Sequence, residues 1–153
     1  MTKRIAIAAD HAGFAEKERM KQTLDEIGVE YQDFGTDSAE SVDYPDFAER
    51  LGKAVAKGEF DEGILFCGSG TGMAIAANKI HGVRAAVAWN EEIAKLSREH
   101  NNANVLALPA RFISDEDAAK IVKAWLAAPF DGGRHARRVD KISAIEDEER
   151  PAE

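Results

Sequence analysis

A chain of 153 residues with 44% hydrophobic and 31% charged residues has the composition of one globular domain, which excludes a fibrous or disordered protein. Its formal net charge of -8 excludes unspecific binding to nucleic acid, because that affinity depends on basic side chains that neutralise phosphates. With a lone cysteine, no signal-peptide pattern and no apolar stretch of membrane-spanning length, we expect a cytoplasmic protein that binds neither nucleic acid nor membrane.

Short apolar runs alternate with longer segments of helical periodicity. This alternation predicts βαβ units around a buried parallel sheet. The expected strands span residues 4–9, 30–34, 63–67, 84–89 and 104–108, and the expected helices span 14–27, 45–57, 71–80, 91–100, 115–127 and 134–145. We therefore predict one α/β domain over residues 1–146, a Rossmann-like three-layer α/β/α sandwich with a five-stranded parallel sheet and a C-terminal helix.

Local signals support two of the helix starts and delimit the domain. Pro45 suits the first turn of the second helix, and Ser114 with Asp117 has the spacing of a capping box for the fifth. Residues 147–153 are mostly acidic and contain a proline. This composition predicts a disordered tail that does not pack on the domain.

Polar residues follow four of the predicted strands: Asp10 and His11 the first, Cys67 the third, Asn90 the fourth and Arg111 the fifth. Ligands of parallel α/β sheets bind beyond the carboxyl ends of the strands. The sequence therefore predicts one polar site at that edge of the sheet.

The segment 67–72, which reads CGSGTG, joins the third predicted strand to a helix. Its glycines allow successive backbone N–H groups to face one concavity, and a helix amino terminus both favours an anion there and lowers the pKa of an adjacent thiol. Cys67 is then a candidate base. Equally, the glycines could form only a tight turn around a core cysteine. A dinucleotide loop is disfavoured because Met73 stands where that fingerprint needs a small residue.

Histidines and arginines supply the other candidates, each with an alternative interpretation. His100 lies at the end of the fourth predicted helix, where it could simply interact with the helix dipole. Arg134 and Arg138 are four residues apart and with Arg111 could hold a phosphate, although such clusters are often only solvated. The chain has four histidines, namely His11, His81, His100 and His135. No two of them have metal-ligand spacing, so we predict no metal site.

Six short motifs occur in order along the chain: ADHAG at 9–13, DYP at 43–45, CGSGTG at 67–72, AANK at 76–79, REHN at 98–101 and GGRH at 132–135. Together they resemble ribose-5-phosphate isomerase type B, over residues 3 to 146. The resemblance implies that ribose 5-phosphate and ribulose 5-phosphate are interconverted through a cis-enediolate, with no metal or organic cofactor. The same superfamily acts on other sugars, so galactose 6-phosphate, allose 6-phosphate or a tetrose phosphate is the alternative substrate. A non-catalytic sugar-phosphate or nucleotide sensor is the second alternative.

The resemblance also implies a role for each site residue. Cys67 is the base, Ser69 relays protons between the sugar oxygens, and His100 opens the furanose ring. A branch of the family instead uses a glutamate at the position of Met73, so this chain resembles the cysteine branch. The implied substrate-binding residues are Asp10, His11, Tyr44, Gly68, Gly70, Thr71, Gly72, Asn101, Arg111, Arg134 and Arg138. Because sites in this family draw residues from two subunits, we expect a homodimer or a dimer of dimers with shared active sites.

Overall fold

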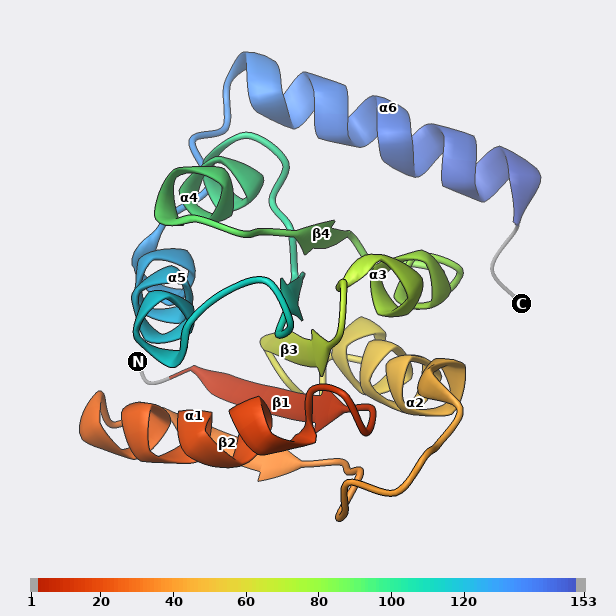
Figure 1. Ribbon diagram of the computed structural model, residues 1–153. Helices are drawn as coiled ribbons and strands as arrows, with labels where there is room; N and C mark the ends of the chain where they lie inside the picture. Colours follow the sequence, from red (N-terminus) through yellow and green to blue (C-terminus); the bar gives the residue numbers. More distant parts are fainter. Residues whose placement is uncertain (1–2, 151–153) are drawn as a thin grey trace.

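The computed structural model describes residues 3–150, which form a three-layer α/β/α sandwich (Figure 1). Five parallel strands stand in the order β2-β1-β3-β5-β4. This confirms the predicted fold class. In chain order the elements are β1 (Arg4–Ala9), α1 (Phe14–Glu26), β2 (Glu30–Asp33), α2 (Tyr44–Ala56), β3 (Glu62–Cys67), α3 (Thr71–Ala77), β4 (Ala85–Val87), α4 (Glu91–Glu99), β5 (Val105–Pro109), α5 (Asp115–Ala127) and α6 (Arg134–Glu149).

The core has two halves, one on each face of the sheet. Helices α1, α4 and α5 cover one face, and α2 and α3 cover the other (Figure 1). Because successive side chains of a strand point to opposite faces, Ile5 and Ile7 of β1 pack into the first half, whereas Ala6 and Ala8 pack into the second. The central strands β1, β3 and β5 are covered on both faces, which explains their nearly continuous apolar sequences.

Strand β4 lies at an edge of the sheet and is shorter than the predicted run of residues 84–89. Its three residues are half-buried. Just before it, helix α3 ends at Ala77 rather than at residue 80. The Asn78 side chain then joins the two elements, since its Oδ1 accepts from the Ala85 N–H at 2.7 Å and its Nδ2 donates to the Ala85 carbonyl at 3.0 Å.

The predicted helix starts agree with the structure. Pro45 lies in the first turn of α2, and the Ser114 Oγ accepts from the Asp117 N–H at 3.1 Å at the start of α5. None of the helices within residues 3–150 combines the length and apolar character needed to cross a bilayer.

Helix α6 lies apart from the two helical layers (Figure 1) and buries only Val139 among its residues. It also continues beyond the predicted domain boundary at residue 146. The Glu146 Oε2 accepts from the Gly82 N–H at 2.9 Å, and the Asp147 Oδ1 lies 2.7 Å from the His81 Nε2. The predicted disordered tail is therefore corrected at 147–150, because these contacts hold the end of α6 against the α3–β4 connection. Residues 151–153 lie outside the described part of the chain.

Candidate active site

A cavity of about 390 Å³ lies beyond the carboxyl ends of β1 and β3. We call it the cysteine pocket. Its walls come from the loop after β1, the start of α2, the turn between β3 and α3, and Arg111 in the segment after β5. The predicted site residues that line it are Asp10, His11, Tyr44, Cys67, Gly68, Ser69, Gly72 and Arg111. Gly70 and Thr71 belong to the same turn but do not line the cavity.

Backbone hydrogen bonds shape the turn that carries Cys67. Gly70 has φ 79°, the left-handed conformation that glycine adopts without strain, and its N–H donates to the Cys67 Sγ at 3.0 Å. The N–H of Thr71 donates to the Ser69 Oγ at 3.3 Å. The segment after β5 is tied to the same turn, since the Arg111 N–H donates to the Gly68 carbonyl at 3.1 Å.

Two glycines of the turn allow larger side chains to approach closely. A Cβ on Gly68 would lie 3.1 Å from the Arg111 Nη1, and a Cβ on Gly72 would lie 2.7 Å from the Tyr44 ring. The glycines therefore leave space for Arg111 and Tyr44 against the turn, in addition to permitting its backbone conformation.

Cys67 is 4% exposed, and burial raises the pKa of its thiol above the usual value. The Asp10 carboxylate raises this pKa further, whereas N–H groups of Met73, Gly70 and Ser69 act in the opposite direction. The sequence-based expectation of a lowered thiol pKa is therefore wrong for the single chain. Loss of hydration outweighs the favourable N–H groups at the start of α3, which is a short helix of seven residues.

Asp10 and His11 fix the neighbouring loops. The buried Asp10 Oδ1 accepts from the Gly13 N–H at 2.9 Å, which closes the turn between β1 and α1. The His11 Nδ1 accepts from the Val42 N–H at 3.2 Å and so attaches the connection before α2 to the pocket. Because Nδ1 is the acceptor, a neutral His11 carries its proton on Nε2, which is then a donor.

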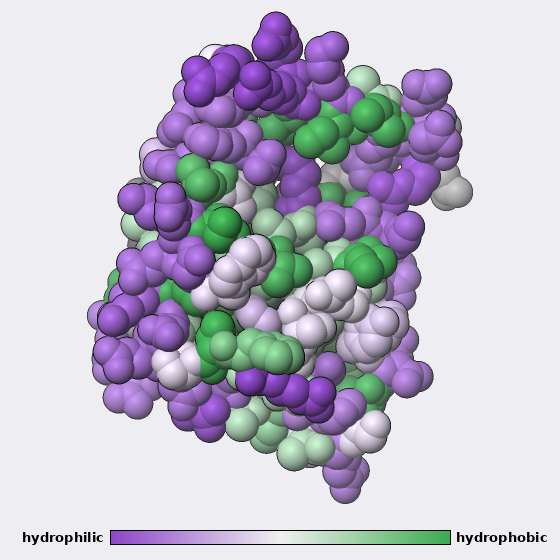
Figure 2. All heavy atoms as spheres, turned by 45° about the horizontal axis from the view of Figure 1, so that its top comes forward, coloured by the Kyte–Doolittle hydropathy of each residue, from purple (hydrophilic) through white to green (hydrophobic). Residues whose placement is uncertain are grey.

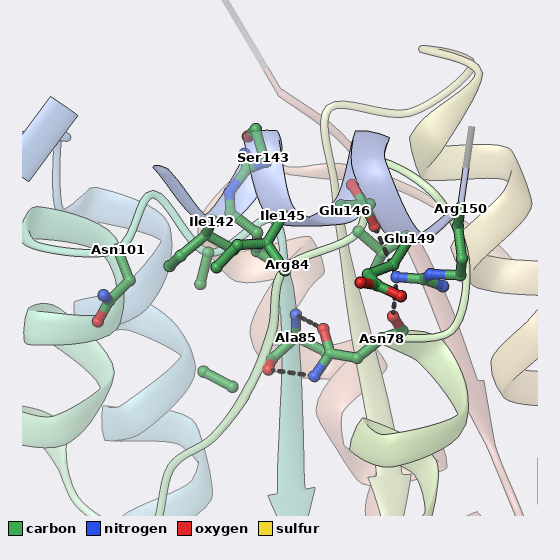
Figure 3. A pocket seen from close by; sticks show the side chains of 13 residues that line it. Asn78, Arg84, Ala85, Asn101, Ile142, Ser143, Ile145, Glu146, Glu149 and Arg150 are labelled. Carbon is green, nitrogen blue, oxygen red and sulfur yellow. Dashed lines mark hydrogen bonds and ion pairs between the residues drawn. The ribbon is translucent and has the colours of Figure 1, made fainter. Parts of the chain in front are cut away.

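A second group of predicted site residues does not line the cysteine pocket. This group, which we call the α4–α6 group, consists of His100, Asn101, Arg134 and Arg138, at the end of α4 and the start of α6. Asn101 instead lines a separate cavity of about 480 Å³ under α6, together with Ile142 and Ile145 (Figure 3). The single chain thus carries the predicted residues in two separate places.

His135 was not among the predicted site residues, although its motif was noted. Its ring stacks on that of His100, with centroids 4.1 Å apart and planes 7° from parallel. Desolvation lowers the pKa of His135, and the charges of His100, Arg134 and Arg138 lower it further. Lack of metal-ligand spacing in the sequence therefore does not keep this pair apart in the fold. The two are 35 positions apart in sequence and meet because the Asp131 N–H donates to the Glu99 carbonyl at 3.0 Å.

Apolar side chains are exposed on α6, which carries part of the α4–α6 group, and on α3 and the segment after β4. Figure 2, with this side turned forward, shows hydrophobic patches between polar residues. The exposed large apolar residues on these elements are Ile75 of α3, Trp89 after β4, and Ile142 and Ile145 of α6. Trp89 is 56% exposed and Ile145 is 62% exposed.

A parallel α/β sheet with convergent polar residues beyond its carboxyl edge is the arrangement in which enzymes of the α/β class place their active sites. The comparisons with known proteins agree. A family model described as Ribose/Galactose Isomerase matches residues 5–142. The chain belongs to this family, and it is an aldose-ketose isomerase.

Relatives in the family are similar over nearly their whole length. Ribose-5-phosphate isomerase B of Escherichia coli is 51% identical over 94% of this chain and 97% of its own. D-erythrulose-4-phosphate isomerase of Pectobacterium atrosepticum is 42% identical over 95% of this chain and 97% of its own.

Solved structures give the same result. Ribose-5-phosphate isomerase B of Clostridium thermocellum is 50% identical with a TM-score of 0.94, over 95% of this chain and 99% of that chain. Ribose-5-phosphate isomerase B of Mycoplasma genitalium, determined with bound ribulose 5-phosphate, is 44% identical with a TM-score of 0.92. The match covers 97% of this chain and 99% of that chain.

Proposed function

We propose that this chain interconverts D-ribose 5-phosphate and D-ribulose 5-phosphate through a cis-enediolate. The observation that carries the proposal is the cysteine pocket, which brings the Cys67 thiol, the Ser69 hydroxyl and the cationic Arg111 to one cavity. The first two are groups that move protons, and the third binds phosphate. Relatives named for ribose 5-phosphate isomerisation and for bound ribulose 5-phosphate support this substrate.

In the proposed reaction the Cys67 thiolate removes the C2 proton of the open-chain aldose. The negative charge that develops on O1 is stabilised by the backbone N–H groups of Gly68 and Gly72. The N–H groups of Gly70 and Thr71 join them once they leave the Cys67 sulfur and the Ser69 oxygen, to which they donate in the free chain. Ser69 passes the O2 proton to O1, and the thiol returns the abstracted proton to C1. Proton count and charge are then restored, and the product is the ketose.

A thiolate is the reactive form, yet burial disfavours it in the single chain. Positive charge close to the sulfur would restore it, since an opposite charge favours the ionised form. His100, Arg134 and Arg138 are the residues of the α4–α6 group that could supply such charge. They would have to come from a second copy, because the cysteine pocket of the single chain does not include them.

We therefore propose a homodimer with shared active sites, in which each cysteine pocket receives the α4–α6 group of the other copy. His100 then opens the furanose ring, Asp10 and Asn101 position sugar hydroxyls, and the arginines hold the phosphate with His11 and Arg111. Four large apolar side chains are exposed and supply apolar surface for such an interface: Ile75, Trp89, Ile142 and Ile145. A two-fold axis would create two equal sites. Pairing of dimers into a tetramer is a further expectation, which the molecular mass in solution decides.

The alternative substrates are tetrose and hexose phosphates. The relative named for D-erythrulose 4-phosphate supports a tetrose phosphate as the first of these alternatives. The chemistry at C1 and C2 is the same for all of them. Incubation of the pure protein with ribose 5-phosphate should yield ribulose 5-phosphate, and kcat/KM should exceed that for tetrose, allose and galactose phosphates. Absence of ribulose 5-phosphate, or a higher kcat/KM for another sugar, would refute the assignment. The cytosol keeps free thiols reduced, which supports the cytoplasm as the site of action of an enzyme with a catalytic cysteine.

A further inference from the structure

Three side chains of metal-binding type meet where α4 ends and α6 begins. Each of His100, Asp131 and His135 offers one ligand atom, and these atoms lie within 4.8 Å of one another. The residues come from separate parts of the chain, namely the C-cap of α4, the loop after α5 and the first turn of α6. We call them the His-Asp-His cluster.

The backbone of the His-Asp-His cluster is held by hydrogen bonds. The His100 N–H donates to the Leu96 carbonyl at 2.8 Å, the Asp131 N–H to the Glu99 carbonyl at 3.0 Å, and the His135 N–H to the Gly132 carbonyl at 3.0 Å. Ligand atoms at ordinary zinc bond lengths stand about 3.3 Å apart around a tetrahedral ion. The ligand atoms, now within 4.8 Å of one another, therefore have to come closer by side-chain rotation alone. The stacked imidazoles have to turn so that one nitrogen of each points at a common centre.

We propose that His100, Asp131 and His135 bind a divalent zinc-like cation, and that this binding inhibits the isomerase. Two imidazoles and one carboxylate are a ligand set that Zn²⁺ accepts, with water in the fourth position. Inhibition rests on the proposed function, because a metal ion would occupy the His100 imidazole that opens the sugar ring. Metal binding itself does not depend on that function.

The surrounding charges make this a reversible site. Arg134 and Arg138 lie close enough to act electrostatically on His135, and they disfavour a cation there. Asp131 is the one anionic ligand of the cluster, and it opposes them. We therefore expect the ion to bind weakly enough for a chelator to remove it without unfolding the protein.

Titration of the chelator-treated protein at pH 7.5 tests the site. Co²⁺ should produce the visible absorption bands of a four-coordinate ion, and Zn²⁺ should displace it and release heat in calorimetry. Asp131→Asn and His135→Gln should each weaken both ions by about tenfold or more. His81→Gln is the matched control, since His81 pairs with Asp147 elsewhere on the surface at 2.7 Å and should bind as the unmodified protein does. Equal affinities for the unmodified protein, Asp131→Asn and His135→Gln would overturn the proposal, as would an equal loss in His81→Gln.

Activity supplies the second readout. Asp131→Asn should retain the basal isomerase rate yet resist inhibition by Zn²⁺, whereas the unmodified protein should lose turnover in parallel with metal occupancy. Metal binding without any loss of turnover would overturn the inhibitory role. If ribose 5-phosphate is not converted at all, the proposed function fails, and the titration still decides whether the cluster binds metal.

Discussion

The cysteine pocket and the α4–α6 group differ in how they are held. The pocket is fixed by the core of its own chain: Cys67 ends a fully buried strand, and backbone bonds and glycine contacts position its neighbours. In the α4–α6 group the arginines are exposed, and α6 buries only Val139. One half of the proposed shared site is thus preorganised within the chain. The other half is presented on an exposed surface, away from the cysteine pocket of the described chain.

Cys67→Ala removes the proposed base from the preorganised half and should have the largest effect. Turnover of ribose 5-phosphate should fall by about 10³-fold, the range expected for loss of a general base. Binding of inorganic phosphate should change little, because the arginines and His11 remain. Steady-state kinetics together with phosphate inhibition constants measure both, and a rate within about tenfold of the original would refute the role of the thiol.

Changes on the exposed half should act through assembly. The double substitution Ile142→Ser and Ile145→Ser removes apolar surface that the single chain leaves exposed at 48% and 62%. We expect monomers by sedimentation and a loss of activity of about tenfold or more at dilute concentration, since one copy carries only part of the site. Ile27→Ser, at the far end of α1 and 39% exposed, is the control that should remain dimeric and active. An active monomer would contradict the shared site.

The fit of Tyr44 against the turn can be tested with one methyl group. Gly72→Ala places a Cβ 2.7 Å from the Tyr44 ring, so the ring must move away from the turn and leave its position in the pocket wall. We expect kcat/KM to fall by about tenfold with a small change in thermal stability. Gly52→Ala, whose Cβ would meet Ile80 of the core at 3.2 Å, should instead affect stability and leave kcat/KM unchanged. The account of Tyr44 fails if Gly72→Ala retains full kcat/KM.

Glu16 lies outside both halves and should leave turnover unaffected, but it sets a pH dependence of stability. Burial, with a smaller contribution from Asp115, raises the pKa of its carboxyl from 4.5 to about 7. The folded protein therefore holds a proton that the unfolded chain releases, so Glu16 should destabilise the fold progressively as pH rises from 4.5 to about 7, by up to about 3 kcal/mol. Urea unfolding of Glu16→Gln should show a weaker fall over this range. An unchanged pH dependence would contradict the raised pKa.

The sequence predicted the cysteine pocket better than the surface half. The alternation of strands and helices, with the rule that ligands bind beyond the carboxyl ends of strands, was sufficient to predict that Asp10, Cys67 and Arg111 lie close together. Their positions depend only on local sequence pattern and sheet geometry. The stacking of His135 on His100 and the extension of α6 to Glu149 depend on contacts between distant segments, which periodicity does not report. The pKa of Cys67 depends on burial in the finished fold, and it was therefore predicted in the wrong direction.

Complementation between two inactive variants tests the shared site most directly. Cys67→Ala lacks the base and His100→Ala lacks the ring-opening group, so each homodimer should be inactive. In a mixture formed by joint refolding, half of the dimers are mixed, and each mixed dimer has one intact site if the two residues come from different copies. We expect about one quarter of the original activity. Activity no higher than that of the separate variants, in a mixture shown to contain mixed dimers, would contradict it.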